Sequence, residues 1–443
     1  MINESLKRLN NIVRNKGGKL YLVGGCVRDK FLDRESKDID VLVTGIDQGN
    51  LEEFLYDAGF YAKLVGKSFG VFKLYLDDCD LDIALPRKER STGDGHKDFE
   101  LEVDKSITIE EDLARRDFTL NSMAIELGTD KLIDPFKGKK DLDRRVIRQI
   151  SNDSIKEDYL RALRAIQFAS RFDNFIIEKE TFANIVKYNN LLETISPERI
   201  RMELEKLLLS NGILKGFNYL LRSGLLKMIL PEVEMLNDER YNFIHHKYNT
   251  YLHTLHSMEA SEKDLEIRLA LLLHDTGKPL TLSQDELGVY HNYGHEEKSA
   301  EIVDEVLTRL KFDSITINNV KILVANHMQP SRTRLRIKQL MSKYGNILTK
   351  KIFEVVYYDK ISTNNKMDIE EFLEILKTMA EIQENNEALK ITDLAIGGEE
   401  LLSLGYKGKV IGDVLKYLLG KVLEDGKLNT KEKLIELIGS YNG

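Results

Sequence analysis

The sequence predicts a multidomain α+β protein, with a head of mixed sheet and helices over residues 1–150 and only helical domains after it. Three observations support this prediction. The chain has 443 residues, which is more than one ordinary domain of about 100 to 200 residues. Short β-type runs alternate with helical stretches before Ser151, whereas the apolar spacing from Ser154 onward is almost wholly helical. With only six prolines and no Pro- or Ser-rich tract, we expect a continuous, ordered chain.

Within the head, four apolar runs have the length and composition of strands, and one stretch has helical spacing. The strand candidates are residues 20–23, 41–43, 71–76 and 81–85, and the helix candidate is residues 48–59. Glycine and proline residues near Ser151, Pro231 and Lys390 predict further boundaries. We therefore expect helical domains over residues 151–235, 236–385 and 386–443.

Cysteine content and the N-terminal residues predict a cytoplasmic protein without a membrane partner. The two cysteines, Cys26 and Cys79, lie in apolar or metal-free contexts. The N-terminal residues lack the long apolar segment of a signal peptide or membrane anchor. A reducing compartment is therefore the expectation.

The net charge of −8 has the wrong sign for a protein that binds nucleic acid over its whole surface. An RNA partner would require a local basic surface. Residues 332–351 contain no acidic residue, and the RNA-binding candidates there are Arg332, Arg334, Arg336 and Lys338. A solvated helix face explains the same segment equally well, so both interpretations stay open.

A phosphate site is predicted where the run at 20–23 meets Gly24 and Gly25. Glycine amides are unobstructed, the start of the following helix is positive, and Arg28 adds charge, so this turn suits a triphosphate. An ordinary tight turn explains two glycines as well. The acidic residues that follow favour the phosphate site.

Two carboxylates, Asp38 and Asp40, immediately precede the run at 41–43. Residues two apart on a strand point to the same side, so these side chains converge and, unpaired, would repel. Mg²⁺ relieves the repulsion, and two such ions about 3.5 to 4 Å apart can activate an attacking hydroxyl and neutralise a leaving pyrophosphate. Asp82 is the candidate third catalytic carboxylate, whereas an exposed ion pair is the favoured interpretation of Asp80.

A basic pair beside an acid follows in residues 112–124, where surface charge alone would explain it. The order GGxVRD, DxD and RRDFTxNxxA, however, resembles the class II tRNA nucleotidyltransferases, which share a polymerase-β-like head with bacterial poly(A) polymerases. The resemblance extends over most of the chain. It implies that Arg116, Asp117 and Asn121 bind the nucleotide, that Mg²⁺ acts in the head, and that the helical neck selects the nucleotide and binds RNA.

Nucleotide choice is expected on a helix over residues 156–164. Asp158 and Arg161 are three residues apart and share a face, and Arg164 follows three residues later. Cytosine and adenine both offer an amine donor beside a ring acceptor, so Asp158 and Arg161 would match them and leave polar groups unpaired with U or G, at about 1 to 3 kcal/mol each. An intrahelical ion pair is the alternative. The EDxxRxLR pattern is similar to the family's amino-acid template, but Gln167 stands where the family commonly has an arginine, so its role stays open.

Two further segments resemble parts of the family. Residues 88–99, which include His96, resemble its flexible loop, implicated in switching from C to A addition, and their glycines permit motion. The presence of this loop favours full CCA addition over a CC-only enzyme. Arg199 resembles a motif that braces the nucleotide-binding helix, although a capped helix start at Ser196 favours a structural interpretation.

The histidines predict a second site, because eight of the nine fall between His245 and His327. Their order resembles the HD phosphohydrolase signature, in which His and carboxylate ligands on apolar helices hold a divalent metal. The ligands are His253, His274, Asp275 and Asp359, with His295 and His327 serving a second metal or holding phosphate. In some relatives this domain hydrolyses phosphomonoesters or 2′,3′-cyclic phosphates, and in others it is scaffold. Because all four core ligands are present, we expect metal-dependent phosphatase or phosphodiesterase activity, with the metal unspecified.

Together these features predict a CCA-adding tRNA nucleotidyltransferase whose partners are the tRNA 3′ end, CTP and ATP. A poly(A) polymerase or an A-adding enzyme is the nearest alternative, since it shares every catalytic residue. An HD phosphohydrolase with a regulatory nucleotide-binding head is an alternative of another class. A catalytically idle RNA-binding protein is disfavoured, because both carboxylates and all metal ligands are present.

Overall fold

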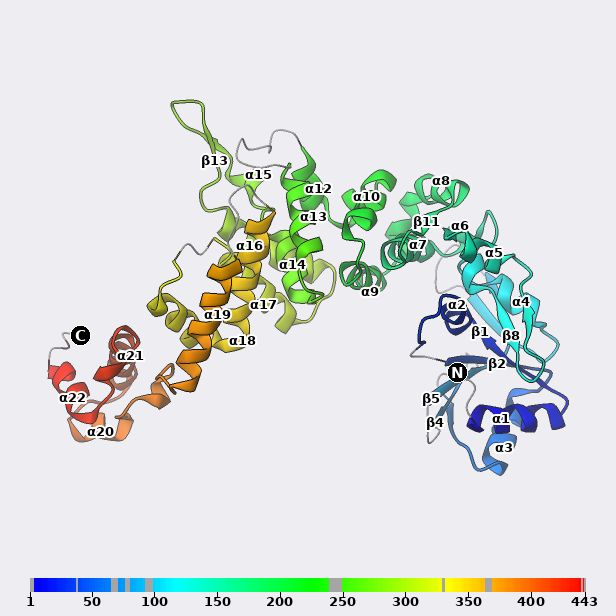
Figure 1. Cartoon of the computed structure of the whole chain (residues 1–443), viewed down its shortest axis with the longest axis horizontal. Coiled ribbons are helices and arrows are strands. Elements are labelled where there is room, and N and C mark those ends of the chain that lie inside the picture. The colour runs from blue at the N-terminus through cyan, green and yellow to red at the C-terminus, as the bar shows by residue number, and fades with distance from the viewer. Residues whose placement is uncertain are drawn as a thin grey trace. The chain divides into compact units, whose positions relative to one another are not determined.

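The structure, a computed structural model, divides the chain into two compact units, Met1–Ile229 and Leu230–Gly443. It describes residues 4–36, 39–64, 71–75, 80–91, 99–238, 249–328, 331–362, 369–439 and 441. Figure 1 shows strands gathered in the blue and cyan N-terminal part of the chain and helices through most of the rest. The predicted class, an α+β head followed by helical domains, is confirmed. The predicted boundaries within each unit stay predictions.

The first unit contains a seven-stranded mixed sheet with the strand order β3-β4-β5-β2-β1-β8-β9. Its strands are β1 (Lys19–Val23), β2 (Ile39–Thr44), β3 (Tyr61–Leu64), β4 (Val71–Tyr75), β5 (Asp80–Ala84), β8 (Ala124–Glu126) and β9 (Lys131–Ile133). β2 and β5 run parallel, and the other neighbours run antiparallel. A separate hairpin pairs β6 (Arg87–Ser91) with β7 (Phe99–Val103). All four predicted strands and the predicted helix, α3 (Gln48–Asp57), are present.

Alternation of side chains gives β4 and β5 one apolar and one polar face. Phe72, Leu74 and Ile83 are fully buried on one side. Lys73 and Asp82, which alternate with them, point to the other side. Asp40 and Asp82 therefore lie on the face opposite to Phe72, Leu74 and Ile83, and further along that face Leu42 and Ala84 pack with Ile109 and Leu113 of the next helical segment.

Helices surround this sheet and continue into the neck. They are α1 (Glu4–Asn15), α2 (Gly25–Phe31), α4 (Ile109–Ala114), α5 (Gly138–Asp143), α6 (Ser154–Glu157), α7 (Leu160–Arg171), α8 (Lys179–Lys187), α9 (Pro197–Leu208), α10 (Ile213–Ser223) and α11 (Leu225–Ile229). Local sequence sets several ends: Thr108 and Glu111 form a capping box at α4, Pro197 opens α9, and Gly224 ends α10 in the left-handed conformation. α7 packs against both α9 and α10, which brings the neck helices together.

The second unit is a bundle of helices. They are α12 (Pro231–Glu234), α13 (Thr250–Ala260), α14 (Leu265–Leu273), α15 (Lys278–Thr281), α16 (His295–Arg309), α17 (Ser314–Ala325), α18 (Arg334–Ile361), α19 (Ile369–Glu384), α20 (Gly398–Ser403), α21 (Lys409–Glu424) and α22 (Lys431–Gly439). The side chains of Asn249, Asp264 and Asp313 cap α13, α14 and α17. α18 is interrupted at Gly345, where φ is 77°.

The almost wholly helical pattern expected after Ser154 is confirmed, with two short strand pairs beside the helices. β11 (Ile176–Ile177) pairs with β10 (Val146–Ile147), and β12 (Ser283–Gln284) forms a hairpin with β13 (Tyr290–His291). Two-residue strands are too short to show a period in the sequence. Among the described residues, no helix is both long and apolar enough to cross a membrane.

Candidate functional site

Two of the predicted carboxylates lie side by side on the polar face of the sheet. Asp40 of β2 is directly opposite Asp82 of β5 in the parallel register, so both side chains point to one face from strands about 4.8 Å apart. Both residues are exposed. Neighbouring carboxylate oxygens of this kind suit a hard divalent cation. Asp38, like the side chain of Asp80, lies outside the part of the chain that the structure describes.

Gly24 allows an arginine to approach these carboxylates. Its φ of 72° lies in the left-handed region, and a Cβ atom there would be 2.5 Å from Nη1 of Arg116 and 3.9 Å from a carboxylate oxygen of Asp40. Glycine therefore avoids both backbone strain and a clash. Arg116 follows α4, where the fully buried Asp112 accepts hydrogen bonds from Arg115 at 2.7 Å and from Arg116 at 3.2 Å. This buried carboxylate holds the basic pair beside the sheet.

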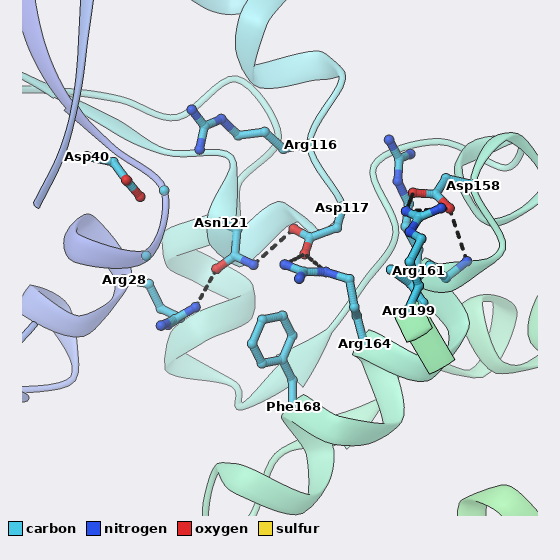
Figure 2. A pocket seen from close by; sticks show the side chains of 13 residues that line it. Arg28, Asp40, Arg116, Asp117, Asn121, Asp158, Arg161, Arg164, Phe168 and Arg199 are labelled. Carbon is cyan, nitrogen blue, oxygen red and sulfur yellow. Dashed lines mark hydrogen bonds and ion pairs between the residues drawn. The ribbon is translucent and has the colours of Figure 1, made fainter. Parts of the chain in front are cut away.

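A series of hydrogen bonds connects the head to α7, as Figure 2 shows. Arg28 donates to the side-chain oxygen of Asn121 at 2.7 Å, and Asn121 donates to Asp117 at 2.9 Å. The second oxygen of Asp117 accepts bonds of 2.7 and 3.0 Å from Arg164. The ring of Phe168 lies 5.5 Å from the guanidinium of Arg28 and 5.4 Å from that of Arg164. One Asn–Asp pair thus fixes two arginines that come from α2 and α7.

Charge pairing decides the protonation of these groups. Burial alone would raise the pKa of Asp117, but the charge of Arg164 and the hydrogen bonds from Asn121 and Arg164 hold that pKa below its usual value. Burial alone would lower the pKa of Arg164, but Asp117 raises it. Burial lowers the pKa of Arg28, with Asp29 opposing the shift. At neutral pH Asp117 is therefore an anion between cationic arginines.

The helix expected over residues 156–164 is interrupted, which corrects the prediction that Asp158 and Arg161 share one helix face. α6 ends at Glu157, Asp158 is extended, and α7 begins at Leu160. The carboxylate of Asp158 accepts a hydrogen bond from the amide of Leu160 at 3.1 Å. Aspartate side chains compete for backbone donors in this way and so favour helix starts over helix interiors.

Long-range partners hold the two selecting residues instead. Asp158 pairs with Arg199 of α9 at 3.1 Å. Arg161 donates to the carbonyl oxygen of Ser154 at 3.1 Å and to that of Arg115 at 2.7 Å. Arg199, for which the sequence favoured a structural interpretation, is therefore part of the site.

These side chains line a cavity of about 440 Å³, within the roughly 300 to 1,000 Å³ typical of small-ligand sites. Its lining residues are Gly24, Gly25, Arg28, Asp40, Arg116, Asp117, Asn121, Asp158, Leu160, Arg161, Arg164, Phe168 and Arg199. All nine residues predicted to bind nucleotide are among them. Five arginines and three aspartates make the local potential positive in a chain whose net charge is −8.

Two residues of α7, Gln167 and Phe168, were given no role by the sequence. Gln167 does not line the cavity: its side chain is 2% exposed, and its amide nitrogen has no hydrogen-bond partner in the described residues. Phe168 was not singled out, although its position four residues after Arg164 places both on one helix face. His96 lies outside the described residues.

The predicted HD ligands converge in the second unit. Nε2 of His253 lies 2.8 Å from a carboxylate oxygen of Asp359, and Nε2 of His274 lies 3.3 Å from oxygens of both Asp275 and Asp359. His327 forms a second group with His274 and Asp275, and within each group the ligand atoms are within 4.8 Å of one another. Two ligands at right angles, each about 2.1 Å from a metal ion, would be about 3 Å apart. These separations therefore fit a bound cation.

Backbone carbonyls orient three of the histidines. Nδ1 of His274, His295 and His327 lies 2.7, 2.8 and 2.7 Å from the carbonyl oxygens of Leu271, Asn292 and Val324. Each Nδ1–H donates to its carbonyl, which leaves Nε2 turned toward the centre. Nε2 of His274 is buried and has no hydrogen-bond partner among the described residues. An orphaned buried nitrogen between two carboxylates fits a metal ligand.

The same centre concentrates negative charge. Burial alone would lower the pKa of His274, but Asp275 and Asp359 raise it to about 10. Burial, together with the charge of His274, lowers the pKa of His327 to about 3. Burial would raise the pKa of Asp275, but His274 and Lys278, whose Nζ is 2.6 Å away, hold it well below its usual value. The carboxylates Asp275 and Asp359 thus favour positive charge at this centre, which a bound cation would supply.

The basic segment at 332–351 is largely neutralised by acidic side chains of the second unit. Lys338 is 3% exposed and pairs with Glu387 at 3.1 Å, so the expectation that it contacts RNA is wrong. Arg334 pairs with Glu381 and Glu387, and Arg332 pairs with Glu371. These partners lie too far along the chain for local charge patterning to reveal them.

Three family models match successive parts of the chain, from the head to the second unit. They are described as "Poly A polymerase head domain" over residues 20–148, "Probable RNA and SrmB- binding site of polymerase A" over residues 174–236, and "HD domain" over residues 243–388. The first range contains the sheet with its carboxylates, and the third contains the histidine centre.

Similar proteins and structures cover most of the chain. It is 38% identical over 302 residues to the multifunctional CCA protein of Nitrosococcus oceani, covering 66% of this chain and 70% of that protein. With the multifunctional CCA protein of Alkalilimnicola ehrlichii it shares 35% identity over 337 residues, covering 73% and 77%. The Bacillus stearothermophilus CCA-adding enzyme in complex with CTP shares the fold, with a TM-score of 0.74 at 22% identity over 99% of this chain and 98% of that one. The Thermotoga maritima CCA-adding enzyme complexed with tRNA has a TM-score of 0.61 at 25% identity over 98% and 95%.

Proposed function

The chain belongs to the family of the multifunctional CCA proteins, and from that premise we propose that it builds the CCA end of tRNA from CTP and ATP, without a template and with release of pyrophosphate. One observation supports this above the others: the carboxylates Asp40 and Asp82 adjoin a cavity lined by five arginines. Nucleotidyl transfer needs carboxylates that can hold a divalent cation beside a surface that suits a triphosphate.

The transfer exchanges one phosphorus–oxygen bond for another. The terminal ribose oxygen of the RNA attacks the α-phosphorus, the bond to the bridging β-phosphate oxygen breaks, and the hydroxyl proton passes to solvent. Mg²⁺, when bound, supplies Lewis acidity to the hydroxyl and positive charge to the pyrophosphate. Asp40 and Asp82 would hold it, with Asp38 expected beside them. Arg28 and Arg116 would bind the triphosphate oxygens through charge-assisted hydrogen bonds.

Base selection is assigned to the break between α6 and α7. Cytosine and adenine present an amine donor beside a ring acceptor. Asp158 would accept from the amine and Arg161 would donate to the ring nitrogen, while Arg164 lies next to them in the cavity. Arg199 holds the carboxylate of Asp158 before a nucleotide arrives, and an ionised carboxylate has about four acceptor sites, so it can accept a further bond.

The histidine centre favours a second activity, metal-dependent hydrolysis of a phosphate ester. The converged ligands His253, His274, Asp275 and Asp359, with the orphaned nitrogen of His274, fit a divalent metal. When bound, that metal would supply Lewis acidity that polarises the phosphate of the substrate and activates a water molecule. In the hydrolysis, a water oxygen bonds to phosphorus, the ester oxygen leaves, and that oxygen takes up a proton.

Stepwise incorporation tests the first activity. We would incubate tRNA transcripts that end before the first C, after the first C or after the second C with each nucleoside triphosphate singly and with all four together. The expected products are C, C and then A. Asp40→Asn should reduce incorporation by about 100-fold or more, while Asp143→Asn, an exposed partner of Lys139, should not change it. Failure of the wild type to incorporate any nucleotide with Mg²⁺ would remove the proposal.

Metal binding tests the second activity separately. Equilibrium dialysis against Mn²⁺, Co²⁺ or Ni²⁺ should show a tight site that His274→Ala and Asp275→Ala abolish together with phosphatase and phosphodiesterase activity. Both variants should still add nucleotides to tRNA. Hydrolysis that survives in them and is lost only in Asp40→Asn would contradict the assignment to the histidine centre.

A further inference from the structure

The polar face of the sheet continues past the carboxylates toward its β3 edge. Across the sheet, β1 leads into Gly24, β2 and β5 carry Asp40 and Asp82, and β4 and β3 come last. Lys73 of β4 is directly opposite Asp82 in the register, so it shares the face of both carboxylates. At about 4.8 Å per strand, Lys73 is roughly 10 Å from Asp40.

Two tyrosines extend this face. Tyr75 is two residues from Lys73 and therefore on the same side of β4, and it is directly opposite Tyr61 of β3. The two rings are 5.8 Å apart and inclined by 38°, and Nζ of Lys73 lies 6.0 Å from the ring of Tyr75. Tyr61 is 71% exposed and Tyr75 is 44% exposed. A cation and two open aromatic rings thus stand next to Asp82.

A cross-strand aromatic pair can stabilise a sheet edge by itself. Such a pair stabilises the sheet by burying apolar ring surface, yet much of the ring surface of Tyr61 and Tyr75 stays exposed to water. Aromatic rings beside a basic side chain are the elements by which proteins bind single-stranded nucleic acid, because bases stack on the rings and the cation offsets a phosphate. The surface therefore fits an RNA strand better than it fits a purely structural pair.

The order of groups across the face agrees with in-line phosphoryl transfer. The triphosphate belongs near Gly24 and Arg116, on the β1 side of Asp40. In an in-line displacement the attacking and leaving oxygens are on opposite sides of the phosphorus. The RNA hydroxyl therefore has to approach from the Asp82 side, where Lys73 lies.

We infer that Lys73, Tyr75 and Tyr61 form a platform for the single-stranded 3′ end of the RNA. Lys73 contacts a backbone phosphate, and the tyrosines stack on the bases that precede the terminal ribose. Stacking tolerates any base, because every base has a π face, so the platform accepts ends of different sequence. The inference rests on the proposed nucleotidyl transfer and adds the RNA side of that site.

Direct binding tests the platform. Fluorescence anisotropy would compare a labelled tRNA that ends after the second C with the same tRNA trimmed to a blunt acceptor stem. Tyr75→Ala and Tyr61→Ala should each weaken binding of the tailed RNA by about tenfold, Tyr75→Phe should bind like the wild type, and Lys73→Ala should reduce the slope of log K against log salt by about 0.7. The blunt RNA should bind all variants equally. KM for tRNA should rise in parallel while KM for CTP stays unchanged.

Two exposed residues of the head provide matched controls. Tyr56→Ala removes a tyrosine of α3 that is 82% exposed, and Lys105→Ala removes a lysine paired with Asp47. Neither should alter RNA binding. All six variants should keep the unfolding temperature of the wild type within a few degrees, because each replaces an exposed or half-exposed side chain.

The outcomes separate the platform from the proposed function. Wild-type affinity in the tyrosine variants of an enzyme that adds CCA would overturn the platform and leave the function standing. A wild type that adds no nucleotide, yet binds the tailed RNA through the tyrosines, would overturn the function and leave the platform. A changed sedimentation coefficient with unchanged RNA binding would mean that this face joins two copies of the chain. A changed Mg²⁺ requirement in Lys73→Ala, with unchanged RNA binding, would mean that the lysine only offsets Asp82.

Discussion

Replacing Asp117 by asparagine would test whether the head has to hold the arginine of α7 in place. Asp117 is 9% exposed, and one of its oxygens accepts bonds of 2.7 and 3.0 Å from Arg164 while the other accepts a bond of 2.9 Å from Asn121. Asparagine keeps the shape but removes the charge and turns one acceptor into a donor. With Asn121 bonded to the remaining oxygen, that donor faces the N–H groups of Arg164.

The size of the effect follows from these bonds. A hydrogen bond to a charged group contributes about 1.5 to 3 kcal/mol. Because the side chain of Arg164 is 34% exposed, water replaces part of what is lost, and we take about 2 kcal/mol as the cost. At about 1.4 kcal/mol per tenfold, kcat/KM for CTP should fall roughly 30-fold if the transfer step requires a placed Arg164.

Incorporation kinetics on a tRNA that lacks its CCA end would measure this loss. CTP and UTP would be compared for the wild type, Asp117→Asn and the control Asp143→Asn. The ratio of kcat/KM for CTP to kcat/KM for UTP should fall in Asp117→Asn and stay unchanged in Asp143→Asn. Thermal unfolding would show that Asp117→Asn is folded. A kcat/KM within twofold of the wild type, with the same preference for CTP, would refute a positioning role for Asp117.

The remaining predictions concern single changes and one pH dependence. Because the folded pKa of Asp117 is depressed, the stability that it contributes should be fully present above the unfolded pKa of about 3.9 and lost as pH falls through the folded value, so acid unfolding curves of the wild type and Asp117→Asn should converge only below about pH 4. Gly24→Ala should cost about 1 to 2 kcal/mol of unfolding free energy from its positive φ and should displace Arg116, which a rise in KM for CTP would report. Asp158→Ala should narrow the preference for CTP and ATP over UTP and GTP by about 1 to 3 kcal/mol, seen in competition assays, and unchanged selectivity would count against its role. Lys338→Ala should lower the unfolding free energy by about 3 kcal/mol in a denaturant titration, and a matching loss of tRNA affinity in the folded variant would restore an RNA contact there.

Local patterns in the sequence predicted the elements that depend on near neighbours. The predictions of a strand at 41–43 and of a turn at Gly24 were correct, because side-chain alternation and glycine conformation depend on residues close in the sequence. The parallel pairing that sets Asp40 opposite Asp82 joins segments about forty residues apart, as their numbers show. No local periodicity encodes such a pairing.

The selecting residues show where local reasoning fails. The three-residue spacing of Asp158 and Arg161 predicted a shared helix face, but the carboxylate of Asp158 bonds to the amide of Leu160 and the helix is interrupted there. Its partner, Arg199, comes from another helix. Spacing rules hold only while the helix continues, and the competition between side chain and backbone decides that.

The basic segment at 332–351 also shows that local sequence does not reveal long-range partners. Residues 332–351 were basic in isolation, but Glu371, Glu381 and Glu387 neutralise two of the arginines in the fold. The histidine ligands were recognisable because several rare residue types occurred in a known order. The carbonyl oxygens that orient their rings carry no signal in the sequence, since every residue has one.

Sequencing the 3′ ends of a tRNA transcript that lacks CCA, after incubation with the protein, Mg²⁺, CTP and ATP, tests the central claim most directly. The cavity beside Asp40 and Asp82 predicts that finished molecules carry C, C and A in that order and grow no further. Tails of repeated A, or unextended ends in the presence of folded protein, would contradict it.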